Sequence, residues 1–264
     1  MTSPALERAL QESDGTEIEA GSKSRETEVT PDRVQSIFNH IAPVYDNLND
    51  RLSGGLHHIW KQMAVGWSRA QPGDRALDVC CGSGDLAFVL AEAVGKSGSV
   101  TAVDFSCQLL DAARDRAQLE LPASAIDWLE GDALALPFEA DCFDAATMGY
   151  GLRNLTDIPQ GLRELHRVLK PGATVAILDM HRPSSPVFRA IQDWYLDALV
   201  VPAATELGVK SEYEYIAPSI DRFPTGDEQV RLAREAGFDR AVHYTTIGGM
   251  MGFLVATKRG TERE

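Results

Sequence analysis

The chain of 264 residues carries 39 acidic against 25 basic side chains, a formal net charge of −14, and 44% hydrophobic residues. Its length and composition fit one sizeable globular domain with additions. The acidic balance argues against nucleic acid as a partner, because no basic cluster is present to neutralise phosphates. Four cysteines without metal-ligand spacing or a disulfide framework indicate a reducing compartment. No apolar run reaches about 18 residues, so we expect no membrane-spanning helix.

Residues 1–30 are rich in acidic, Ser, Gly and Thr residues and poor in apolar ones, which predicts a disordered acidic tail before a domain over 31–264. Thr30-Pro31-Asp32 is typical of a helix start. Tyr45 and Asp46 follow this helix in a polar segment, and a second amphipathic helix begins at two adjacent histidines. We expect these elements, about 31–68, to form part of a lid. Adjacent histidines on a helix point in different directions, so we predict no metal site.

A glycine turn between a short apolar strand and a helix organises the middle of the chain. The strand contains Asp78 and runs into Cys80-Cys81-Gly82-Ser83-Gly84-Asp85. Gly82 and Gly84 allow a tight turn that comes close to a ligand, and the first N–H groups of the helix face that ligand. Acidic residues on both sides of the turn would repel a pyrophosphate. They favour a ligand with an ammonium and a sulfonium, so the pattern predicts S-adenosylmethionine rather than a nicotinamide cofactor.

Acidic residues also follow the next two predicted strands. The second strand ends in Asp104, followed by Phe105, and a carboxylate there can accept hydrogen bonds from both hydroxyls of a ribose. The third strand ends before Asp132 and Ala133, an acid and a small residue that suit the exocyclic amine and the ring of adenine. A helix-cap or turn role for Asp132 is the alternative. Together with the glycine turn, these residues predict a nucleoside-bearing cofactor.

The fourth predicted strand, over 143–148, runs into the loop Gly149-Tyr150-Gly151-Leu152-Arg153-Asn154. Ligands bind at the carboxyl ends of strands in open α/β sheets, so glycines beside an arginine and an amide predict a pocket here. Further along, an amphipathic stretch with aromatic residues over 186–207 is either packing or the wall of a channel for a long apolar substrate. We place it in a second lid segment, about 183–225. The remaining predicted elements are a helix over 158–169, a strand over 173–178, a helix starting near 223, and strands over 242–244 and 253–256.

The order of these parts resembles that of the class I S-adenosylmethionine-dependent methyltransferases. This implies an α/β fold, a mostly parallel, doubly wound sheet with a reversed final strand. Residues 32–258 are similar to the ubiquinone/menaquinone-biosynthesis C-methyltransferase family. The motifs that carry this likeness are the segment 38–49, Gly-Leu-Arg-Asn at 151–154, Tyr-Glu-Tyr at 213–215 and Glu-Ala-Gly-Phe at 235–238. Within the family, the segments 77–85, 103–106, 148–154 and 248–256 are similar to the demethylphylloquinone methyltransferases of cyanobacteria and plastids.

The resemblance implies S-adenosylmethionine-dependent C-methylation of a prenylated naphthoquinol, 2-phytyl-1,4-naphthoquinol to phylloquinone. It places Ser83 at the methionine end of the cofactor, Asp104 at the ribose, and Asp132 with Ala133 at the adenine. Relatives often have a cofactor-touching serine at the position of Gly149. The expected cofactor-binding set is Asp78, Gly82, Ser83, Gly84, Asp104, Phe105, Asp132, Ala133 and Gly149.

The expected catalytic residues are Arg153, Asn154 and Asp46. A reduced ring that loses a phenolic proton attacks a methyl group, and holding both partners close supplies much of the acceleration. Arg153 can stabilise the phenolate, with a salt bridge to a lid acid as the alternative. Asn154 can orient that oxygen or a water, and Asp46 is a candidate proton acceptor. We expect Tyr45 and Tyr150 to contact the substrate.

Three alternatives stay open at this stage. They are a methyltransferase acting on another prenyl quinone, a sterol or a small phenol; a nicotinamide-dependent reductase; and a cofactor-binding member of a quinone-biosynthetic complex without turnover. The expected partner is a lipophilic quinol in the cytoplasm or plastid stroma. Without a basic amphipathic helix, contact with a membrane surface would be apolar or mediated by a partner. The sequence does not indicate an oligomeric state.

Overall fold

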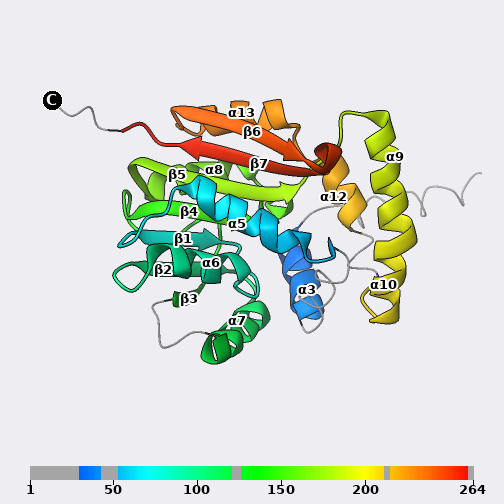
Figure 1. Cartoon of the computed structure of the whole chain (residues 1–264), viewed down its shortest axis with the longest axis horizontal. Helices are drawn as coiled ribbons and strands as arrows, with labels where there is room; N and C mark the ends of the chain where they lie inside the picture. Colours follow the sequence, from blue (N-terminus) through cyan, green and yellow to red (C-terminus); the bar gives the residue numbers. More distant parts are fainter. Residues whose placement is uncertain (1–29, 43–52, 121–125, 211–214, 261–264) are drawn as a thin grey trace, which may run out of the picture.

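A seven-stranded sheet in the order β3-β2-β1-β4-β5-β7-β6 forms the centre of the computed structural model, which describes residues 30–42, 53–120, 126–210 and 215–260 (Figure 1). All neighbouring strands from β3 to β5 are parallel, whereas β7 runs antiparallel to β5 and β6. The predicted fold class, a class I methyltransferase sheet with a reversed final strand, is confirmed. The strands are β1 Arg75–Val79, β2 Ser99–Asp104, β3 Ile126–Glu130, β4 Phe143–Gly149, β5 Leu169–Met180, β6 Arg240–Thr246 and β7 Met251–Thr257.

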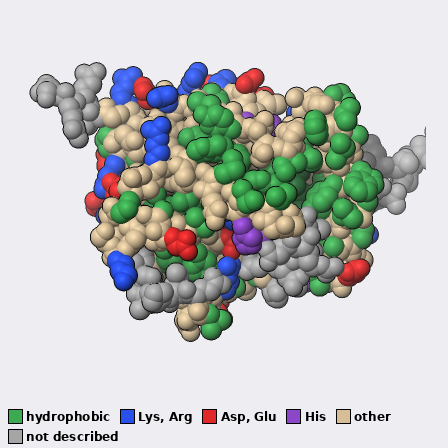
Figure 2. Space-filling view, viewed as in Figure 1, with side chains coloured by type: hydrophobic (Ala, Val, Ile, Leu, Met, Phe, Trp, Pro, Cys, Tyr) green, Lys and Arg blue, Asp and Glu red, His purple; other side chains and the backbone are tan. Residues whose placement is uncertain are grey.

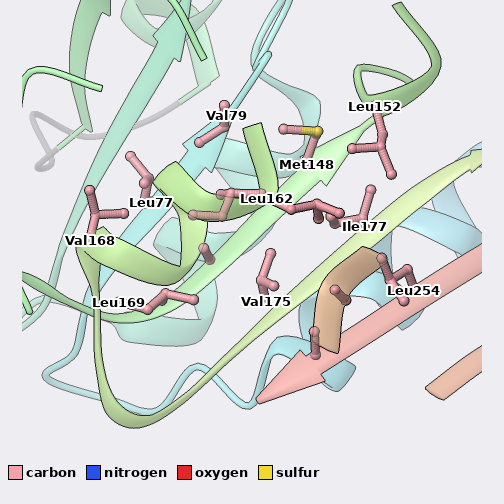
Figure 3. Packing of buried hydrophobic residues seen from close by; sticks show 14 of the residues in the cluster. Leu77, Val79, Met148, Leu152, Leu162, Val168, Leu169, Val175, Ile177 and Leu254 are labelled. Atoms are coloured by element: carbon pink, nitrogen blue, oxygen red, sulfur yellow. The ribbon is translucent and has the colours of Figure 1, made fainter. Parts of the chain in front are cut away.

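Helices cover both faces of the sheet, which is why its central strands are apolar on both sides. In β1, Leu77 and Val79 pack into one buried cluster with α8 and α13 (Figure 3). Ala76 packs into another cluster with α5 and α6. The helices of the two layers are α5 Leu56–Ser68, α6 Asp85–Val94, α7 Cys107–Glu120, α8 Ile158–Val168 and α13 Gly226–Glu235.

A third group of helices lies beyond the carboxyl ends of the parallel strands (Figure 1). Ile41 of α3, Leu196 and Val200 of η3, and Ile220 of α12 share one buried apolar cluster. This cluster joins segments that are far apart in the sequence and forms a wall next to the strand ends. The elements of this group are α3 Pro31–Ile41, α9 Pro186–Tyr195, η3 Leu196–Val200, α10 Val201–Glu206 and α12 Ile216–Arg222, and the 3-10 turns η2 Leu152–Asn154 and η4 Ile247–Gly249 lie beside it.

Most predicted elements are present, with three differences. Strand β5 starts at Leu169 rather than at residue 173, because Leu169 pairs with Phe143 ahead of a register shift. The stretch over 186–207 is a helical run that includes one π-helical turn, η3. Helix α12 was not predicted, because its seven residues are too few to show a helical period. Within the described ranges no helix has the length and apolar character needed to cross a membrane. Residues 1–29 of the predicted acidic tail lie outside those ranges.

Candidate active site

The glycine turn and the two strand-end acids meet at one cavity of about 230 Å³, at the carboxyl ends of β1, β2 and β4. Eight of the predicted site residues line it, which brings together side chains from separate parts of the chain: Gly82, Asp104, Phe105, Asp132, Ala133, Gly149, Tyr150 and Asn154. Its wall among the described residues is Val34, Phe38, Val79, Cys80, Gly82, Val103, Asp104, Phe105, Leu109, Gly131, Asp132, Ala133, Leu134, Gly149, Tyr150, Gly151, Asn154, Leu155 and Thr156.

The turn itself leaves room for a ligand against the backbone. Gly82 has a φ of +56°, and a Cβ built there would meet no atom within 4 Å, so the space above it is open. Gly84, at φ +95°, is the N-cap of α6, and a Cβ there would come within 2.6 Å of the ring of Trp128. Glycine is therefore required at Gly84 by its backbone angle and by packing, while the open space at Gly82 lets a ligand approach the backbone closely.

The strand-end acids are held in place by backbone N–H groups. Asp104 accepts hydrogen bonds from the N–H of Gly82 at 2.8 Å and from that of Ser106 at 2.9 Å. Burial nevertheless raises the pKa of Asp104 to about 6. A carboxylate has about four acceptor positions, so both ribose hydroxyls can still be accepted. Asp132 accepts the N–H of Leu134 at 2.8 Å beside the nearly buried Ala133.

Asp78 lies fully buried next to the glycine turn. The hydroxyl of Thr147 donates to its Oδ1 at 2.8 Å, while its Oδ2 has no hydrogen-bond partner. Burial raises the pKa of Asp78 to about 8. An unpaired buried carboxylate oxygen beside a cofactor cavity fits the ammonium group of S-adenosylmethionine, which would supply the missing partner.

Three of the predicted cofactor-binding residues, Asp78, Ser83 and Gly84, do not line this cavity, and neither does Asp85. Ser83 is buried and its carbonyl accepts a hydrogen bond from Arg116 at 3.1 Å. Asp85 forms ion pairs with Lys61 and, at 2.7 Å, with Arg116. Burial opposes its charged form, but these two cations hold the pKa of Asp85 at about 2. The expectation that Asp85 favours the cofactor's cations is therefore corrected, because its charge is neutralised within the protein.

A second, larger cavity of about 330 Å³ adjoins the first. Phe38, Tyr150 and Asn154 line both cavities, so a ligand in one lies next to a ligand in the other. We call the second cavity the apolar chamber. Its wall among the described residues is Ile37, Phe38, Ile41, Ser53, Leu56, His57, Trp60, Tyr150, Arg153, Asn154, Met180, Ile191, Gln192, Trp194, Tyr195, Leu196, Val200, Tyr215, Ile216, Ile247, Met250 and Met251.

Asn154 lines both cavities, and its neighbour Arg153 lines the apolar chamber. The guanidinium of Arg153 forms a nearly buried ion pair with Asp179 and donates to the carbonyl of Tyr150 at 3.0 Å. Asp179 also accepts the backbone N–H of Arg153 at 3.0 Å. The amide nitrogen of Asn154 donates to the same Tyr150 carbonyl at 2.9 Å. The partner of Arg153 is thus an acid at the end of β5 rather than the lid acid that we expected as an alternative.

Two predicted residues, Tyr45 and Asp46, lie outside the described residues. Sequence reasoning gave Asp179 no role, although an acid at the carboxyl end of a buried strand is the same signal that identified Asp104. The described parts of the chain contain no group of three or more His, Cys, Asp or Glu side chains that could hold a metal ion.

A mostly parallel sheet with a reversed last strand, a glycine turn after β1 and acids at the ends of β2 and β3 is the arrangement expected of the class I S-adenosylmethionine-dependent methyltransferases. A methyltransferase of this kind from Thermotoga maritima superposes with a TM-score of 0.60 at 20% identity, covering 86% of this chain and 100% of its own. One from Aquifex aeolicus gives a TM-score of 0.53 at 21% identity, covering 71% of this chain and 84% of its own. These similarities support the fold class.

The chain belongs to the ubiE/COQ5 methyltransferase family, whose model matches residues 26–260. It is 63% identical, over 85% of its length and 98% of the relative, to the Nostoc punctiforme protein named 2-phytyl-1,4-naphtoquinone methyltransferase. It is 53% identical, over 84% of its length and 86% of the relative, to the chloroplastic 2-phytyl-1,4-beta-naphthoquinone methyltransferase of Arabidopsis thaliana. The protein is a methyltransferase that uses S-adenosylmethionine, as predicted, and the nicotinamide-dependent reductase is excluded.

Proposed function

We propose that the protein methylates 2-phytyl-1,4-naphthoquinol at the free ring carbon beside the phytyl group, which gives phylloquinone in its reduced form. The observation that carries this proposal is the 63% identity, over nearly the whole relative, to a protein named for this substrate. The apolar chamber next to the cofactor cavity supports it, because a fused aromatic ring with a hydrocarbon tail needs an apolar site.

Different residues would bind the separate parts of the cofactor. Asp78, Gly82, Ser83 and Gly84 would hold the methionine part of the cofactor. The ribose would bind Asp104, and the adenine would lie among Phe105, Asp132, Ala133 and Gly149. When bound, S-adenosylmethionine supplies an electrophilic methyl group at the boundary of the two cavities. No metal ion is needed for this transfer.

At that boundary, Arg153 would stabilise the negative charge that forms on the ring oxygen when the phenolic proton leaves. Asp179 keeps the guanidinium in place, so no reorganisation is required at the moment of reaction. Asn154 would orient the ring oxygen, and Tyr150 and Tyr45 would contact the ring. Asp46 remains our candidate for the proton acceptor.

We further propose that the phytyl tail leaves the chamber at a rim of exposed apolar side chains and reaches a membrane surface there. The rim consists of Leu56, Ile191, Trp194 and Ile247, which line the chamber and are also exposed, Trp194 by 62%. Figure 2 shows apolar side chains gathered over this side of the molecule, around α9 and the start of α5. With a net charge of −14, attraction to anionic lipids is not expected, so this contact would be apolar.

The test is incubation of the protein with methyl-labelled S-adenosylmethionine and 2-phytyl-1,4-naphthoquinone, with and without a reductant. We expect label in phylloquinone only under reduction. If another prenyl quinol were methylated with a higher kcat/KM than the phytyl compound, that quinol would be the substrate instead. Cofactor binding without transfer to any naphthoquinol would refute it.

A further inference from the structure

The apolar chamber contains few polar side chains, and most of them have partners in the protein. Ser53 and His57 share a hydrogen bond of 2.6 Å, and Arg153 is paired with Asp179. The side-chain amide of Gln192 donates to the carbonyl of His181 at 3.0 Å. Apart from Arg153, whose guanidinium is already paired with Asp179, two chamber-lining residues in the described part of the chain keep a buried polar atom without a hydrogen-bond partner. These atoms are Oδ1 of Asn154 and the hydroxyl of Tyr215.

The orientation of the Asn154 amide follows from its neighbour. The carbonyl of Tyr150 can only accept, so the group 2.9 Å from it must be the amide nitrogen, which donates. The amide oxygen then faces away from this carbonyl, and the residue is only 8% exposed. A buried oxygen that can only accept is costly when unpaired, so its natural partner is a ligand that donates a hydrogen bond.

The two oxidation states of a naphthoquinone ring differ in whether their oxygens can donate a hydrogen bond. The quinone presents two carbonyl oxygens, which only accept, whereas the quinol presents two hydroxyls, which can donate. We propose that Asn154 Oδ1 selects the reduced ring by accepting the hydrogen bond of one hydroxyl, so that the oxidised ring leaves this oxygen unpaired. The inference rests on the proposed naphthoquinol substrate and adds a residue that distinguishes its redox states.

The hydroxyl of Tyr215 binds the other ring oxygen, and it does so in both redox states of the ring. Its ring lies 5.5 Å from the guanidinium of Arg222, which holds it in the wall of the chamber. A phenolic hydroxyl can donate to a carbonyl and accept from a hydroxyl. It therefore pairs with both forms of the ring and contributes affinity without discrimination. Tyr215 is thus a positioning residue and Asn154 the selective one.

The experiment compares two variants, Asn154→Ala and Tyr215→Phe, with the wild-type protein saturated with S-adenosylhomocysteine. The probes are 2-methyl-1,4-naphthoquinone and its quinol, titrated anaerobically while the fluorescence of the tryptophans is followed, since Trp60 and Trp194 line the chamber. The readout is the ratio of the quinone Kd to the quinol Kd. Because both values come from one preparation, a partly unfolded fraction cancels in the ratio.

We expect a ratio of about ten for the wild type, the effect of one unpaired buried acceptor. For Asn154→Ala the ratio should fall to about one, because no acceptor remains to be left unpaired. For Tyr215→Phe it should stay near the wild-type value while both dissociation constants rise several-fold. The loop backbone should keep its position in Asn154→Ala, because the carbonyl of Tyr150 still accepts the hydrogen bond from Arg153.

An unchanged ratio in Asn154→Ala, or a wild-type ratio near one, would overturn the inference. Loss of S-adenosylmethionine affinity in Asn154→Ala without a change in the ratio would show that the amide oxygen serves the cofactor cavity instead. These binding results do not depend on methyl transfer to the phytyl substrate. A failure of the proposed function would appear only in the labelling assay, so the two failures can be told apart.

Discussion

Gly151 can be tested as the residue that lets the loop after β4 approach the glycine turn. A Cβ built at Gly151 would lie 2.6 Å from Cβ and 2.7 Å from Sγ of Cys80, and 3.1 Å from Cγ of Met148. Carbon atoms in contact prefer about 3.5–4.0 Å. Met148 is fully buried and Cys80 directly follows the central strand β1, so neither neighbour can move freely. Overpacking of this kind costs about 1–3 kcal/mol, and we expect Gly151→Ala to lose about 2 kcal/mol of unfolding free energy.

A second substitution shows whether the Cβ–Cβ contact is the cause. Cys80→Ala removes the sulfur but keeps the Cβ, so it should rescue Gly151→Ala only slightly. Cys80→Gly removes both atoms and also relieves the left-handed backbone of Cys80, φ +57°, which costs a non-glycine residue about 1–2 kcal/mol. The added chain entropy of glycine offsets about 0.5–1 kcal/mol. We therefore expect Cys80→Gly to restore most of the stability of Gly151→Ala.

Urea unfolding of the single and double variants measures these differences in unfolding free energy. Titration with S-adenosylmethionine measures the effect of each variant on cofactor affinity. Cys80 and Gly151 both line the cofactor cavity, so Gly151→Ala should also weaken cofactor binding, and Cys80→Gly should restore it. If Cys80→Ala rescued Gly151→Ala as well as Cys80→Gly, the sulfur would be the obstacle and the argument from the Cβ positions would be refuted.

Three further predictions concern charge and exposure. Asp179→Asn leaves the buried Arg153 without its counter-charge, so we expect a loss of about 3–5 kcal/mol in urea unfolding and a lower kcat; an unchanged kcat would count against a fixed guanidinium in the reaction. Asp78, with a pKa of about 8 in the free protein, should release about one proton at pH 7 when the cofactor ammonium binds. Affinity should then rise with pH up to about 8, and calorimetry that gave the same heat in buffers of different ionisation enthalpy would contradict this. Trp194→Ser should weaken sedimentation with neutral lipid vesicles several-fold at any salt concentration without changing cofactor affinity, and a strong salt dependence would refute an apolar contact.

The parts of the site that the sequence predicts are those set by local chain geometry. Gly82 and Gly84 favour a turn through their own backbone freedom. Asp104 is the last residue of β2, so its place at the carboxyl end of the sheet is fixed by the strand. The same holds for the loop that carries Asn154. A reversed last strand was likewise predictable from the resemblance.

The parts that could not be predicted depend on partners far away in the sequence. Asp85 follows the glycine turn, but Lys61 and Arg116 reach it from α5 and α7, and no local pattern announces these contacts. Asp179 becomes the partner of Arg153 only because β4 and β5 are neighbours in the sheet. The apolar chamber is likewise formed by helices from both ends of the chain, so the polar side chains in its wall could not be predicted from the sequence.

The loop after β4 connects the two cavities because β5 holds it from one side. The N–H of Tyr150 donates to the carbonyl of Leu178 at 2.7 Å, and that of Arg153 donates to Asp179 at 3.0 Å. The carbonyl of Tyr150 in turn accepts from the side chains of Arg153 and Asn154. A displacement of this one peptide would therefore shift residues that line the first cavity and residues that line the apolar chamber together. Methyl transfer needs both partners placed within a fraction of an ångström, and a short loop tied to the end of a central strand can provide this where a longer connection could not.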